Sequence, residues 1–334
     1  MRQVIEKMMQ LVAEDRFLSF QNDVVACLYE ALGQGYSANE NEVALVKRLV
    51  EAANGQNYGA LQLSAAMLHG SRSYVEFNYL DKPVTKELGD MAVITVVTSG
   101  RSRLFQRISI IQNKKNAGEK WDVDLEQLFL LKNFPPFSGN KGIFKGCGGL
   151  AFRNLSGCLG AFGLLNQPGE MMFAAAPLVT ELLSGKKSIT AADTSYLSSQ
   201  GRTHGGDNCF LSSLWPFHPR FHPEKWFFLM EEVFGRHGYI WGAGNGHNAL
   251  LGNECFCRDL YDFIKSWTHL SIGEVTFVSG EVVNSQVDAF ANLLIRRAGF
   301  ADQIDLPDDS IFGDSPFNGQ LAILMAHVDV SVRG

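Results

Sequence analysis

Hydrophobic positions in the first 35 residues repeat with the three-to-four-residue period of an amphipathic α-helix. The positions that carry this pattern are Val4, Met8, Leu11, Val12, Phe20, Val24, Val25, Leu28 and Leu32. Gly33 and Gly35 end the pattern. A further helix is expected over residues 42–53, where four valines and leucines share one face and Gly55 follows the end. Residues 58–69 fit a helix and a strand equally well.

From Ser73 onward the pattern changes to one typical of β-strands. Residues 74–80 alternate apolar and polar side chains. The β-branched runs 87–94 and 108–111 follow, with turn-forming residues between them, so we expect these two runs to pair as an antiparallel hairpin. Asp124 is a favourable N-cap for a helix over residues 125–133, which Pro135 must end. The order in this part of the chain is therefore helix, three strands, helix.

The second half of the chain mixes helical and β patterns without an internal repeat. Helices are expected over residues 177–183, 223–234, 257–267 and 283–298, and strands over 274–278 and 323–332. A glycine-rich stretch over residues 141–163 precedes them and marks close backbone approach or a change of domain. The whole pattern predicts an α/β protein. We expect an N-terminal helical segment over residues 1–40, a core over 41–150 and a second α/β region over 151–334.

The composition is that of a globular protein, with 46% hydrophobic and 19% charged residues. The N-terminus lacks the apolar stretch of a secretory signal, and no uninterrupted apolar segment of roughly 20 residues is present to span a bilayer. Six cysteines without a CxxC pair are too few for a disulfide scaffold. These features predict a cytoplasmic protein without a membrane partner.

The charge is unevenly distributed along the chain. The net charge is −6, which disfavours nucleic-acid binding when it is taken for the molecule as a whole. Residues 71–153, which contain the expected hairpin, nevertheless carry 13 basic and 8 acidic side chains and form the one positive segment. Phosphate binding depends on local lysines and arginines rather than on the total charge. A nucleic-acid partner therefore remains compatible with the acidic sequence.

Three polar residues lie where the two strands of the expected hairpin would meet. Asp90 belongs to the first strand, and Gln112 and Lys114 end the second. Gln112 and Lys114 are two positions apart and project from one face, whereas Asn113 points away. A carboxylate and an amide oxygen can bind Mg²⁺ or Mn²⁺, and a nearby lysine can orient a water molecule or stabilise negative charge on a phosphate. The arrangement predicts a divalent-metal phosphodiesterase site, unless these residues are only a polar strand end in solvent.

The order of elements, with an acid in the second strand and a [D/E/Q]-x-K tripeptide in the third, resembles the PD-(D/E)XK nuclease superfamily. The matching residues are Gly89-Asp90 and Gln112-Asn113-Lys114, and the resemblance covers residues 40–150 only. Gly89 stands in place of proline, and Gln112 in place of the acid, as in the Mrr-like branch of restriction endonucleases. The resemblance implies a restriction-endonuclease-like core of helix, three-stranded antiparallel meander, helix and further strand. It also implies cleavage of DNA with Mg²⁺ or Mn²⁺, in restriction or anti-phage defence.

The resemblance implies roles for individual residues as well. Asp90 and Gln112 would hold the metal, Lys114 would assist the attacking water, and Glu42 on the preceding helix would add a ligand. Rivals for the role of Glu42 are Glu40, Glu51 and Glu76. Candidate phosphate contacts are Arg101, Arg103, Arg107 and Lys115. Gln127 matches the first position of a Q-x-x-x-Y motif found in some relatives, but Leu131 replaces its tyrosine.

Two other functions stay open. The missing carboxylate at Gln112 also fits a catalytically inactive module of the same fold that binds nucleic acid or a protein partner. His327 and Asp329 share one strand face and could form the acid–base pair of an unrelated hydrolase, although no nucleophile motif such as GxSxG accompanies them. The sequence is compatible with a homodimer and does not identify the substrate.

Overall fold

The structure is a computed structural model that describes residues 2–68, 71–118, 120–142, 145, 148–153, 155, 157–183, 185–194, 254–307 and 319–332. Three helices begin the chain: α1 (Arg2–Val12), α2 (Asp15–Ser37) and α3 (Glu42–Ala53). The other labelled helices in the described ranges are α4 (Leu125–Asn133), α5 (Ala176–Leu183), α9 (Leu260–Thr268) and α10 (Ser285–Arg297), with a 3-10 turn at Ala301–Gln303.

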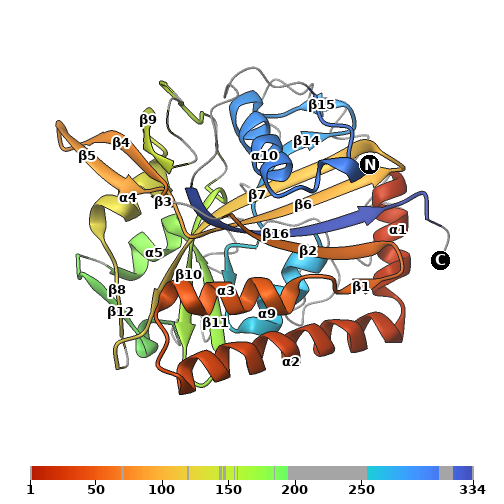
Figure 1. Ribbon diagram of the computed structural model, residues 1–334, viewed down its shortest axis with the longest axis horizontal. Helices are drawn as coiled ribbons and strands as arrows, with labels where there is room; N and C mark the ends of the chain where they lie inside the picture. The colour runs from red at the N-terminus through yellow and green to blue at the C-terminus, as the bar shows by residue number, and fades with distance from the viewer. Residues whose placement is uncertain are drawn as a thin grey trace.

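A large mixed sheet runs through the centre of the molecule (Figure 1). Its strands lie in the order β1 (Asn57–Tyr58), β2 (Leu61–Leu68), β16 (Gly319–Asp329), β6 (Met91–Ser99), β7 (Ser102–Lys115), β10 (Gly160–Asn166), β11 (Glu170–Ala175) and β13 (Phe256–Cys257). β14 (Glu274–Val278) pairs with β7 and with β15 (Glu281–Val282), and β3 (Ser71–Arg72) pairs with β16. β6 and β7 form the predicted antiparallel hairpin, whereas β16 runs parallel to its neighbour β6 and β10 runs parallel to its neighbour β7.

Helices cover both faces of this sheet. One hydrophobic core lies under α1, α2, α3 and α9, and a second lies under α4, α5 and α10. Successive residues of the central strands contribute to opposite cores: Val93 and Ile111 to the first, Ile94 and Ile110 to the second. Burial on both faces explains why β6 is a nearly uninterrupted apolar run in the sequence. The predicted α/β class is therefore confirmed.

The predicted strand over residues 74–80 forms, but it lies outside the central sheet. β4 (Tyr74–Tyr79) pairs with β5 (Lys82–Glu87) and β9 (Phe137–Lys141) in a separate three-stranded sheet, and β8 (Lys120–Asp122) pairs with β12 (Ser188–Thr190) in another. The neighbour of β6 on the side away from β7 is β16, from the end of the chain. The prediction of a three-stranded antiparallel meander is therefore wrong in its first strand.

The other predicted helices and strands agree with the structure to different degrees. α3, α4 and β14 have the predicted bounds, and α5, α9, α10 and β16 differ from prediction only at their ends. The helix expected over residues 223–234 lies outside the described residues. Strands from beyond residue 150 pair in the same sheet as β6 and β7, so the described parts of the expected core and second region share one sheet. Within the described ranges, no helix combines the length and apolar character needed to cross a membrane.

Candidate active site

Asp90 immediately precedes β6, and two neighbouring strands hold its backbone. Its N–H donates to the carbonyl oxygen of Ile111 in β7 at 3.0 Å, and its own carbonyl oxygen accepts from the Ala322 N–H in β16 at 2.9 Å. Gly89 lies against β7, where an added Cβ would come within 2.8 Å of Ile110 Cγ2 and 3.1 Å of the Ile111 carbonyl oxygen. A side chain at position 89 is therefore disfavoured by the same strand that holds Asp90.

The end of β7 extends past the start of β6 and exposes backbone donors along its edge. Met91 pairs with Ile111, so within the described residues positions 112–115 have no strand partner on that edge. Two carboxylates accept their hydrogen bonds instead. The Asn113 N–H donates to Asp90 Oδ2 at 2.8 Å, and the Lys115 N–H donates to Glu42 Oε1 at 2.8 Å. Because amides two residues apart point to the same edge of a strand, about 7 Å from each other, Asp90 and Glu42 lie side by side along β7.

Two buried glutamines connect Asp90 to α4. Gln112 Nε2 donates to Asp90 Oδ2, and Gln127 Nε2 donates to Gln112 Oε1. Gln127 Nε2 also donates to the carbonyl oxygen of Glu87 at 3.1 Å. The exposed fractions of Gln112 and Gln127 are 4% and 6%. Gln112 therefore presents its amide nitrogen, rather than its oxygen, to Asp90.

The surroundings of Asp90 oppose its ionisation. The pKa of Asp90 is raised to about 7, mainly by burial and next by the charge of Glu87, with a smaller contribution from Glu42. The Asn113 N–H and the Lys114 ammonium lower the pKa without cancelling this rise. When Asp90 is ionised, the neighbouring negative charges repel its carboxylate. Binding of a proton or a cation there therefore lowers the free energy of the site.

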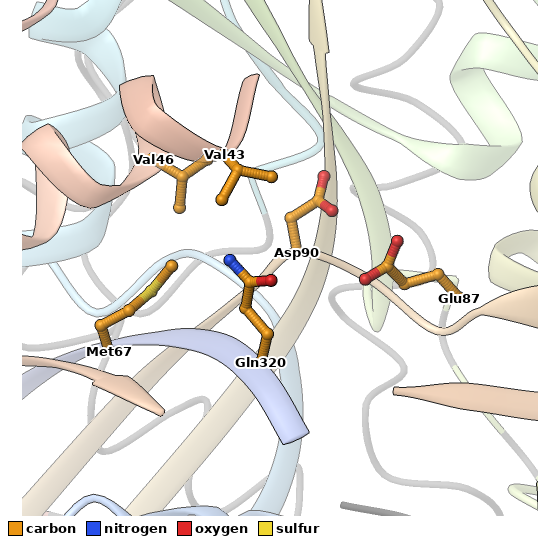
Figure 2. A pocket seen from close by; sticks show the side chains of 6 residues that line it. All are labelled: Val43, Val46, Met67, Glu87, Asp90 and Gln320. Carbon is orange, nitrogen blue, oxygen red and sulfur yellow. The ribbon is translucent and has the colours of Figure 1, made fainter. Parts of the chain in front are cut away.

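Asp90 also lines a cavity of about 10 Å³, which is the room of roughly one water molecule or small ion. Figure 2 shows the carboxylate of Glu87 turned toward Asp90 at this cavity. Gln320 of β16 completes the polar side, and the apolar wall comes from α3 and β2 through Val43, Val46 and Met67. The cavity thus brings together elements from both ends of the chain.

The rival acids named with Glu42 lie in other interactions. Glu40 pairs with Arg48 at 2.7 Å, and Glu51 pairs with Lys47 at 3.7 Å. Glu76 lies in β4 and accepts a hydrogen bond from β9 at 3.4 Å. Among these acids, the charge of Glu42 is the one that acts on Asp90. The geometry therefore favours Glu42 over its rivals.

The proposed phosphate contacts are only partly accessible. Arg103 forms an ion pair with Asp288 of α10 at 2.9 Å, with both side chains 4% exposed, and Arg107 is 2% exposed. The prediction that these two arginines contact phosphate is wrong, because both side chains are buried, Arg103 against helix α10. Lys115 is half-buried and donates its Nζ to a backbone carbonyl oxygen just before α3 at 2.7 Å. Arg101 is exposed on the turn between β6 and β7.

The alternative pair in β16 makes structural contacts. His327 shares a buried hydrogen bond of 2.9 Å with the Thr98 hydroxyl, and burial lowers its pKa. Asp329 Oδ1 accepts from the Gly100 N–H at 3.0 Å and from the Ser331 N–H at 2.9 Å. These bonds fix the β6–β7 turn against the end of β16. The two side chains are accounted for without a hydrolase site.

Comparisons of this chain with protein-family models, with curated proteins and with solved structures found no match. In the part of the chain that the structure describes, no three His, Cys, Asp or Glu side chains are grouped closely enough to form a metal site by themselves. The structure places Gln112 in hydrogen-bonding contact with Asp90, and the charges of Glu42 and Lys114 both act on the pKa of Asp90.

Two residues of the site were missed by the sequence reasoning. Glu87 stands three positions before Asp90 at the end of β5, and this closeness in the sequence is a local signal that it could turn toward the same cavity. Gln320 carries no such signal, because only the parallel pairing of β16 with β6 brings it there.

Proposed function

We propose that this protein is a metal-dependent phosphodiesterase that cleaves nucleic acid, with DNA as the expected substrate, at the site around Asp90. The observation that supports this function best is the environment of Asp90. Burial and the charges of Glu87 and Glu42 raise the pKa of its carboxyl group to about 7, although the charge of Lys114 acts in the opposite direction. A carboxylate that only stabilises the fold is expected to have a close cationic partner, which lowers its pKa.

The residues present fit Mg²⁺ or Mn²⁺. Mg²⁺ is commonly held by one or two carboxylates and keeps several water ligands, so a group of three protein acids is not required. Asp90 would hold the ion through Oδ1, because Oδ2 already accepts hydrogen bonds from Gln112 and from the Asn113 N–H. Either Glu87 or Glu42 would supply a second carboxylate. When bound, such an ion polarises a phosphoryl oxygen and lowers the pKa of a coordinated water.

The other residues supply orientation and positive charge. Lys114 projects from the same face of β7 as Gln112, and its charge acts on Asp90. A positive charge at this point stabilises the negative charge that develops on a phosphate during attack by water. Gln112 and Gln127 fix the side chain of Asp90. A role in restriction or anti-phage defence follows from the resemblance alone, since a fold does not determine a function.

The test is cleavage of a panel of linear, circular, single-stranded and methylated DNA, and of RNA, in Mg²⁺ or Mn²⁺. We expect cleavage by the wild type and none by Asp90→Ala or Lys114→Ala. Matched controls are Asp122→Ala and Lys120→Ala, which remove the same charges from exposed positions of β8; both should cleave like the wild type. Cleavage that survives Asp90→Ala and Lys114→Ala contradicts the site. Nucleic-acid binding without cleavage by the wild type identifies the inactive module instead.

A further inference from the structure

Gln127 and Gln112 form a chain of hydrogen bonds from the Glu87 carbonyl oxygen to Asp90. The acceptors at the two ends of this chain fix which way each amide points. A backbone carbonyl oxygen and an ionised carboxylate can only accept hydrogen bonds. Gln127 must therefore turn its NH₂ group toward Glu87, and the same group donates to Gln112 Oε1. Gln112 must in turn direct its NH₂ group to Asp90 Oδ2. Exchanging the nitrogen and oxygen of either amide would place two oxygens against each other.

We propose that Gln127 and Gln112 form a one-way relay that positions Asp90, and that Gln112 is a positioning residue rather than a metal ligand. The hydrogen bonds of the Gln112 NH₂ group go to Asp90 Oδ2 and to the carbonyl oxygen of Asn113 at 3.3 Å, and its oxygen accepts from Gln127. The amide oxygen that the tripeptide would offer to a metal is therefore engaged on the side away from Asp90. The metal part of this inference rests on the proposed function, whereas the relay itself does not.

The two amides of the relay are buried between α4 and the sheet. α4 packs on the sheet through Leu128 and Leu131, and Gln112 lies beside Phe162 of β10 in the register of the sheet. An apolar pair would fill this layer without the desolvation cost of two amides, which a buried site tolerates only when every donor and acceptor is matched. The hydrogen bonds of the two amides hold Asp90 through its Oδ2.

Gln127→Glu reverses the relay and separates the two roles of Gln112. A carboxylate at position 127 only accepts, so Gln112 must turn its NH₂ group to it and present its oxygen to Asp90. If Gln112 positions Asp90, the loss of one donor raises the Asp90 pKa by about one to two pH units and weakens Mn²⁺ binding at pH 7 roughly tenfold. If Gln112 is a ligand, its oxygen now faces the ion and Mn²⁺ binds more tightly.

The measurements are Mn²⁺ affinity by electron paramagnetic resonance and the titration of Asp90 by ¹³C NMR on the metal-free protein. Asn133→Asp adds the same charge to an exposed position of α4. It should leave both the Mn²⁺ affinity and the Asp90 pKa close to their wild-type values. Gln127→Met removes the hydrogen bond to Gln112 Oε1 without adding charge, and should weaken Mn²⁺ binding by less than Gln127→Glu does. It takes the place of Gln127→Glu if that variant does not fold.

Each outcome decides one claim. The relay is overturned if either Gln127 variant binds Mn²⁺ more tightly than the wild type. It is also overturned if the Asp90 pKa in both Gln127 variants equals that in Asn133→Asp. A wild type that binds no Mn²⁺ overturns the proposed function, and the Asp90 titration still tests the relay in that case.

Discussion

Asp90→Asn should stabilise the folded protein at alkaline pH. The pKa of Asp90 rises from 3.8 to about 7 on folding, so the folded state holds the proton more tightly than the unfolded chain. Stability from this group is therefore complete below about pH 4 and is lost as the pH rises through about 7. A rise of about three pH units at 1.36 kcal/mol each sets an upper limit of about 4 kcal/mol at pH 8. Partial access of water to the half-buried carboxylate reduces this figure to about 2 kcal/mol.

Asparagine removes the charge and keeps an oxygen that accepts from Gln112 and from the Asn113 N–H. We expect Asp90→Asn to exceed the wild type by about 2 kcal/mol in free energy of unfolding at pH 8 and to match it near pH 4. Urea denaturation at pH 4, 6 and 8, followed by tryptophan fluorescence, measures the difference, with exposed Asp122→Asn as the matched control. A variant that is less stable than the wild type at pH 8, or a difference that is the same at every pH, refutes the reasoning.

Three further predictions concern the framework around the site. Asp288→Ala leaves its buried arginine partner without a counter-charge and should lower the free energy of unfolding by about 3–5 kcal/mol in urea titrations; a loss below about 1 kcal/mol would contradict the buried ion pair. Gly160→Ala places a Cβ 2.0 Å from the Leu131 carbonyl oxygen and should cost about 1–3 kcal/mol or more, whereas Gly148→Ala meets nothing within 4 Å and should unfold near the wild-type temperature. Burial lowers the pKa of His327 below 6.5, so its contribution is complete above pH 6.5 and is lost as the pH falls through the lowered pKa. His327→Gln should therefore lose less stability than the wild type between about pH 7 and 5, and an equal decline in both would show that His327 is not responsible.

The local elements of this fold could be predicted from the sequence because their signals are local. Asp124 caps α4 through the N–H groups of Glu126 and Gln127, and the helix ends before the prolines as expected. The hairpin of β6 and β7 follows from two β-branched runs and a turn at Gly100, whose φ of +61° suits glycine. Pairing of β16 with β6 has no such signal, because it joins segments from distant parts of the chain. For this reason β4 was assigned to the wrong sheet.

The candidate site shows the same division. The meeting of Asp90 with Gln112 could be predicted from the register of one hairpin, and the hydrogen bond between them confirms it. The direction of the Gln112 amide could not, since it depends on Gln127 and on the Glu87 carbonyl oxygen. Arg103 shows how a polar strand position can mislead, because its partner Asp288 comes from a helix far along the chain. Charge at a strand position predicts a phosphate contact only when nothing else buries it.

The function of Asp90 is tested most directly by the cleavage activity of Asp90→Asn, the variant that is expected to be folded and more stable at pH 8. The account predicts that wild type and Asp122→Asn cleave nucleic acid in Mg²⁺ or Mn²⁺ at pH 8, and that Asp90→Asn has no measurable activity. Wild-type cleavage together with an Asp90→Asn variant that cleaves at a similar rate would contradict the assignment of Asp90 as the metal-binding carboxylate.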